Sequence, residues 1–187
     1  MTYLTQGIVL RRDHLSECDR RYVIYTKELG KISAIAKGAK KIISKLNSHL
    51  DYFCIANLML AKGSNCERIA SAQIQSRFPS IVGNSLKSTS AFYFCEVSDS
   101  LIKFTLSDGK TFQIMEDFYS ALDGAQNKNE VLLALNASIF ELLKRLGYEP
   151  EITAKNQKQL LFDLNKLIQY TAEKEVKSFE FLYKFFT

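Results

Sequence analysis

Hydrophobic and polar residues alternate along the first 78 residues of the chain, in short runs separated by turn residues. Runs of this kind are typical of half-buried β-strands. The pattern predicts five strands, within residues 7–12, 20–28, 31–37, 50–63 and 67–74. Because an open sheet of five strands would leave two unpaired edges, we expect a small closed barrel.

After residue 78 the hydrophobic residues recur at every third or fourth position, which is the period of amphipathic helices. Apolar stripes predict helices within residues 86–104, 111–124, 129–146 and 158–173. The stripe of the third helix comprises Leu132, Leu135, Ile139, Leu142 and Leu146. Asn129 is a candidate N-cap of that helix, and Gly147 lies where a left-handed residue would end it.

The change of period divides the chain into two expected domains. Residues 1–78 are expected to form a small β-barrel domain, and residues 79–187 a helical bundle, so that the fold class is α+β. The last segment, EVKSFEFLYKFFT, is apolar on more than one face, and we expect it to be buried in the bundle rather than left for a partner.

Charge is distributed unevenly between the two expected domains. Residues 1–78 hold 13 Lys and Arg against 6 Asp and Glu, which gives +7, whereas residues 79–187 hold 12 against 14, which gives −2. A basic first domain favours an anionic partner, although the same charge would also keep a small domain soluble. No apolar run is long enough to cross a membrane, and the N-terminus lacks a signal peptide, so we expect a cytoplasmic protein.

The lysines gather at the end of the third predicted strand, in KISAIAKGAKKIISK. The lysine ammonium is a point charge that suits the phosphates of a nucleic acid but distinguishes base edges poorly. The lysines therefore predict binding of nucleic acid without sequence preference. The loop DHLSECD is acidic, and its carboxylates are expected to pair with the flanking arginines. Candidate stacking aromatics, expected mostly in the core, are Tyr22, Tyr25, Tyr52 and Phe53. A small five-stranded barrel with a basic surface is typical of OB folds that bind nucleic acid, so residues 1–78 are expected to form an OB-fold nucleic-acid-binding domain. The candidate DNA-binding residues are Arg11, Arg12, Arg20, Arg21, Lys31, Lys37, Lys40, Lys41 and Lys45.

The sequence lacks a recognisable catalytic or metal-binding motif. Its four cysteines and two histidines do not have the spacing of a zinc site. His14, Ser16 and Cys18 are close in sequence, but no motif brackets them, and neither a phosphate-binding loop nor a dinucleotide fingerprint occurs. We therefore expect a binding protein without catalytic residues, metal or cofactor, and an unfamiliar hydrolase site is the minor alternative.

The segment TQGIVLRRDHLSECDRRYVIYTKELGKISAIAKGAKK resembles the N-terminus of the RecO family of bacterial DNA repair and recombination mediator proteins. The matching residues are Gly7–Leu10, Glu17, Asp19, Arg20, Thr26, Gly30, Lys31 and Ala36–Ala39. A second match, LLKRLGYEP, resembles the family's helix that ends in Leu-Gly-Tyr-x-Pro. The chain departs from many members in having no cysteine after Cys95, so the zinc finger of those members is absent, and it is also short for the family.

The resemblance implies a non-enzymatic recombination mediator, cytoplasmic and nucleoid-associated. Such a protein binds single-stranded and double-stranded DNA, anneals complementary strands, and works with RecR to help load the RecA recombinase. It also binds the C-terminal tail of single-strand-binding protein, for which Lys144 and Arg145 are the candidate partner-binding residues. The alternative is a protein-only adaptor that docks repair or replication proteins without binding DNA, with an exposed apolar patch around Phe181, Phe185 and Phe186.

Overall fold

The structure is a computed structural model that describes residues 2–39, 49–63, 66–104, 107–150 and 153–186. The chain forms two compact units. The barrel unit comprises Met1–Arg77 and Lys103–Phe112, and the helical unit comprises Phe78–Ile102 and Gln113–Thr187. The segment Lys103–Phe112 thus lies within the barrel unit although it follows the first long helix in sequence.

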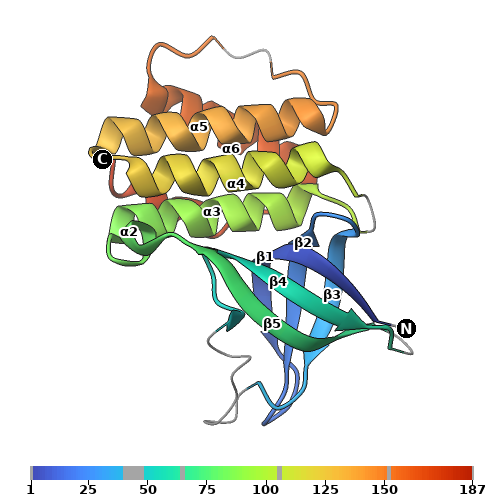
Figure 1. Cartoon of the computed structure of the whole chain (residues 1–187). Coiled ribbons are helices and arrows are strands. Elements are labelled where there is room, and N and C mark those ends of the chain that lie inside the picture. Colours follow the sequence, from blue (N-terminus) through green and yellow to red (C-terminus); the bar gives the residue numbers. More distant parts are fainter. Residues whose placement is uncertain (1, 40–48, 64–65, 105–106, 151–152, 187) are drawn as a thin grey trace. The chain divides into compact units, whose positions relative to one another are not determined.

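Five strands form the barrel unit: β1 (Thr2–His14), β2 (Arg20–Thr26), β3 (Gly30–Ala36), β4 (Cys54–Ala61) and β5 (Glu67–Arg77). They close in the order β1-β2-β3-β5-β4 (Figure 1). Neighbouring strands are antiparallel except β3 and β5, which pair in parallel and close the barrel. The expected five-stranded OB-type barrel and the α+β class are confirmed.

Strand β1 is longer than its hydrophobic run predicts, because it pairs with two strands. Its first half pairs with β4, from Thr2 to Ile8, and its second half pairs with β2, from Gly7 to His14. The register shifts between Val9 and Arg11, where an extra residue bends the strand. The bend lets one strand pair with β4 through its first half and with β2 through its second half.

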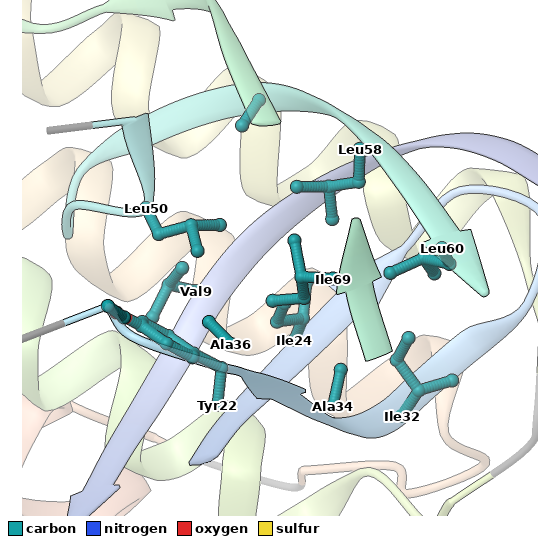
Figure 2. Packing of buried hydrophobic residues seen from close by; sticks show 12 residues of the cluster. Val9, Tyr22, Ile24, Ile32, Ala34, Ala36, Leu50, Leu58, Leu60 and Ile69 are labelled. Atoms are coloured by element: carbon teal, nitrogen blue, oxygen red, sulfur yellow. The ribbon is translucent and has the colours of Figure 1, made fainter. Parts of the chain in front are cut away.

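Alternate residues of the strands fill the barrel, and Figure 2 shows the packed side chains of Ile24, Ile32, Leu58, Leu60 and Ile69. This is the period-2 burial that the sequence predicts. Gly7 belongs to the same packing. A Cβ at that position would lie 2.6 Å from Cδ1 of Leu58 and 2.7 Å from Cγ2 of Ile24. A side chain at position 7 would therefore require Leu58 and Ile24 to shift.

The helical unit contains α2 (Pro79–Val82), α3 (Ser85–Leu101), α5 (Lys128–Arg145), α6 (Gln157–Ala172) and α7 (Ser178–Tyr183), together with most of α4 (Gly109–Gly124). The predicted helices are present, and α2 is a short addition. In α5 the predicted stripe is buried as far as Leu142, and Leu146 is half-buried. No helix in the described ranges combines the length and apolar character that crossing a membrane requires.

The two ends of α5 test the predicted caps. The N-cap is Asn127, whose side chain accepts a hydrogen bond from the Glu130 N–H, so the prediction of Asn129 is wrong by two residues. Gly147 has a φ of 88°, and the N–H groups of Gly147 and Tyr148 donate to the carbonyls of Lys144 and Leu143. This is the glycine-terminated C-cap that the sequence predicts.

The C-terminal segment is buried only in part. Val176 and Leu182 are buried, and the centre of the Phe179 ring lies 5.7 Å from the centre of the Tyr93 ring. Phe181 is 63% exposed, whereas Phe185 and Phe186 are half-buried. The expected burial therefore holds for one face of this segment and not for Phe181.

Candidate nucleic-acid interface

Basic side chains gather at one end of the barrel because three strands meet there. Antiparallel pairing places His14 opposite Arg20, Asp13 opposite Arg21, and Arg20 opposite Ala36. The last residues of β1, the first residues of β2 and the residue after β3 thus share one end. We call this the basic end, and it comprises Arg11, Arg12, Arg20, Arg21 and Lys37.

Two of these arginines are engaged with carboxylates. Arg11 Nε lies 3.0 Å from Asp13 Oδ1, as the acidic loop led us to expect. Arg12 pairs instead with Asp51, and its guanidinium lies 4.2 Å from the centre of the Tyr52 ring. The Arg12 backbone N–H donates to the Tyr52 hydroxyl at 3.1 Å. Arg12 therefore ties β1 to the residues that precede β4.

Arg21 and Lys37 are the basic-end residues most available to a ligand. Both side chains are exposed, and neither pairs with an acidic residue within the described part of the chain. Arg20 is half-buried. Lys40, Lys41 and Lys45, which the sequence also predicts to bind DNA, lie outside the described residues.

Lys31 does not share this exposed surface. It is 4% exposed, and its ammonium lies 4.7 Å from the centre of the Phe104 ring. Lys31 and Phe104 also form an isolated parallel bridge. Lys31 is a candidate DNA-binding residue by sequence, but a distant segment covers it, so it does not belong to the exposed basic end.

The same distant segment covers part of the outer face of β2 and β3. The Tyr25 hydroxyl donates to the Asp108 carbonyl at 3.1 Å, and the Ser107 hydroxyl donates to the Lys27 carbonyl at 3.4 Å. Phe104 is 49% exposed and lies beyond the end of α3 at Leu101, so the helix predicted within residues 86–104 ends earlier than its apolar stripe indicates. OB folds commonly bind oligonucleotides on this face of strands 2 and 3. Because this segment covers part of that face, the exposed basic end is the more accessible place for a nucleic acid to bind.

The candidate stacking aromatics are mostly core residues, as expected. Tyr22, Tyr25 and Phe53 are buried. Tyr52 is half-buried, and the Arg12 guanidinium lies over its ring. The basic end thus offers cations rather than exposed aromatic rings within the described residues.

Lys144 and Arg145 are exposed in the last turn of α5, where positive charge is favourable beside the helix C-terminus. A cavity of about 800 Å³ in the helical unit is lined by Ser80, Lys87 and Asp123 rather than by this pair. The Lys87 ammonium donates to the Ser80 hydroxyl and to the Asp123 carbonyl, each at 2.7 Å. Lys87 therefore joins α3 to the end of α4.

The described residues contain no group of three His, Cys, Asp or Glu side chains that could hold a metal. Burial raises the pKa of the Cys95 thiol to about 12. Burial, and next the Asp51 carboxylate, raise the pKa of Cys54. Both thiols are therefore held in the protonated form, which is neither nucleophilic nor metal-binding.

Some contacts of this site could not have been found from local sequence patterns. Asp51 is 39 residues from Arg12, and Asp108 is 83 residues from Tyr25. The charge pattern does identify the arginines and lysines as a group. It does not show which of them a distant carboxylate or ring engages.

Comparison with known proteins agrees with the resemblance carried by the sequence signature. A family model described as "Recombination protein O N terminal" matches residues 1–78. A "DNA repair protein RecO" of Clostridium perfringens is 32% identical over 144 residues, which are 76% of this chain and 57% of that protein. One of Roseiflexus sp. is 31% identical over 150 residues, which are 80% of this chain and 52% of that protein.

The chain belongs to the RecO family. A further RecO, from Dehalococcoides mccartyi, is 29% identical over 150 residues, covering 80% of this chain and 58% of that protein. The chain thus spans little more than half the length of the RecO proteins it matches.

Proposed function

We propose that this RecO-family chain is a non-enzymatic recombination mediator in DNA repair that binds single-stranded and double-stranded DNA at its basic end. The observation that carries the proposal is the exposure of Arg21 and Lys37 at one end of an OB-type barrel, without acidic partners in the described residues. Cations placed on a rigid barrel edge neutralise phosphates and release their counterions. Family membership supports a role in DNA repair.

The interface suits sequence-independent binding. The basic end presents arginine and lysine side chains, and Tyr22 and Tyr25 are buried and do not stack on bases. Contacts to phosphates position a nucleic acid without reading its sequence. Annealing requires two phosphate backbones to approach, and a basic surface lowers their mutual repulsion. We infer that the chain anneals complementary strands in this way.

Annealing of two complementary oligonucleotides, labelled as a fluorescence donor–acceptor pair, tests the proposal. The double variant Arg21→Ala/Lys37→Ala removes two charges from the basic end. The control, Lys27→Ala/Lys62→Ala, removes two exposed charges from the opposite end of the barrel, beside the β2–β3 turn and after β4. We expect the control to anneal at the wild-type rate and the basic-end variant to anneal several-fold more slowly. Equal rates for both variants would place the DNA elsewhere.

Partners of the chain are part of the same proposal. We expect RecR, the RecA pathway and the C-terminal tail of single-strand-binding protein to be its partners, with Lys144 and Arg145 holding acidic groups of the tail. Both residues are exposed on α5. Binding of a labelled tail peptide should weaken in Lys144→Ala/Arg145→Ala. An unchanged affinity would move the tail to another part of the chain.

A protein-only adaptor is the competing function. The exposed Phe181 on α7 is the observation that favours it. If the wild type fails to bind oligonucleotide at low salt, the DNA-binding proposal is wrong and the adaptor remains. The annealing and binding measurements therefore separate the two functions.

A further inference from the structure

Asp19 is an acidic residue at the basic end, next in sequence to Arg20 and Arg21. A carboxylate there repels phosphate, so simple electrostatics makes it a disadvantage for DNA binding. The hydrogen bonds of Asp19 indicate a different role. They connect two segments that are 19 residues apart in sequence.

The Asp19 carboxylate binds the residue that follows Lys37. Asp19 Oδ1 accepts a hydrogen bond from the Gly38 N–H at 2.8 Å. The ladder between β2 and β3 ends with Arg20 opposite Ala36, and the bond joins the residue before Arg20 to the residue two positions after Ala36. The Asp19–Gly38 bond thus continues the connection of the two strands past the point where their backbones stop pairing.

Asp19 is itself held in place by the β1–β2 loop. Its N–H donates to the Ser16 hydroxyl at 3.1 Å, and the Ser16 N–H donates to the Asp19 carbonyl at 3.4 Å. On the other side of the bond, Gly38 has a φ of 65°, a left-handed conformation that glycine adopts without strain. Both partners are therefore fixed by local structure, and the bond determines where the turn after β3 lies.

Lys37 is carried by that turn. Its side chain is long and mobile, and the entropy lost on binding a phosphate is smaller if its backbone is already fixed. We propose that Asp19 is a positioning residue of the DNA interface, which holds Lys37 beside Arg20 and Arg21 through the Asp19–Gly38 bond. This inference rests on the proposed function, because it assigns a role within the same site.

Two substitutions separate the hydrogen bond from the charge. Asp19→Asn removes the negative charge but keeps an oxygen that accepts from the Gly38 N–H. Asp19→Ala removes both the charge and the acceptor. We expect Asp19→Asn to bind a labelled single-stranded oligonucleotide at least as tightly as the wild type. We expect Asp19→Ala to bind roughly fivefold more weakly than Asp19→Asn, about the value of one ordinary hydrogen bond.

The same pair of variants in a Lys37→Ala background tests whether Asp19 acts through Lys37. With Lys37 absent, Asp19→Ala and Asp19→Asn should bind with equal affinity, because the cation that the Asp19–Gly38 bond is proposed to position is gone. A difference that persists without Lys37 would overturn the positioning role. Equal affinities of the two variants in the wild-type background would also overturn it, and would show that Asp19 acts on DNA only by its charge.

Hydrogen exchange of the Gly38 amide, measured without DNA on the full chain, reports the bond itself. Its protection should persist in Asp19→Asn and be lost in Asp19→Ala, while both variants stay folded by thermal unfolding. Equal exchange in all three proteins overturns the inference alone. A wild type that shows Gly38 protection but no oligonucleotide binding overturns the proposed function, and with it the role of Asp19.

Discussion

At the scale of single residues, the barrel core is packed so closely that one position on β1 accommodates only glycine without a shift of its neighbours. Gly7 lies on β1 against the buried side chains of Ile24 and Leu58. Both neighbours are packed by the remaining core residues, so they cannot move aside without strain. The glycine of the GIVL segment is thus a requirement of core packing.

We expect Gly7→Ala to lower the free energy of unfolding by about 1–3 kcal/mol, the usual cost of overpacking a core. Chemical denaturation of the full chain measures this difference. Gly124→Ala is the matched control, because within the described part of the chain no atom beyond its chain neighbours and the backbone of its own helix lies within 4 Å of a Cβ built at that position. Equal destabilisation by both substitutions would show that the effect comes from the glycine backbone rather than from contact with Ile24 and Leu58.

At the scale of secondary-structure elements, the caps of α5 show how local chemistry sets the ends of a helix. Asn127 caps the helix through the Glu130 N–H, and the Glu130 carboxylate accepts in return from the Gln126 N–H at 2.6 Å. The two side chains satisfy backbone donors at the helix start, in the manner of a capping box. Asn129 has the right residue type but lies inside the first turn, so its side chain is not the one that caps the helix.

Asn127→Ala should therefore destabilise the chain by about 1 kcal/mol, the typical loss of an N-cap. Asn129→Ala should leave stability nearly unchanged, since alanine is a better helix former than asparagine. Thermal unfolding of the two variants side by side measures the difference. An equal loss for both would contradict the assignment of Asn127 as the cap.

The sequence predicts these elements better than it predicts the site. Strands and long helices follow from hydrophobic periods within short windows, and those windows contain all the needed information. The candidate site depends on contacts such as Lys31 with Phe104, which join residues 73 positions apart. No local pattern distinguishes a lysine that will be covered by such a residue from one that stays exposed. The basic residues were thus predicted as a group, while their individual environments required the structure.

At the scale of the whole molecule, the charge of the chain is concentrated in the part that forms the barrel. Residues 1–78 carry +7 and residues 79–187 carry −2. A surplus of one sign raises the local concentration of an oppositely charged ligand and speeds its association. The exposed members of the basic end then determine which phosphates are neutralised. We therefore propose that the basic end, and not net charge alone, is responsible for binding DNA.

The most direct test of this claim is the salt dependence of oligonucleotide binding, measured by fluorescence anisotropy for the wild type and two double variants. The slope of the logarithm of the binding constant against the logarithm of salt concentration should become shallower by roughly 0.7 for each lost phosphate contact on single-stranded DNA. We predict a slope smaller by roughly 1.4 for Arg21→Ala/Lys37→Ala and an unchanged slope for Lys27→Ala/Lys62→Ala. The two variants carry the same net charge, so an equal loss of slope and affinity in both would contradict binding at the basic end. A wild type that does not bind the oligonucleotide would contradict it too.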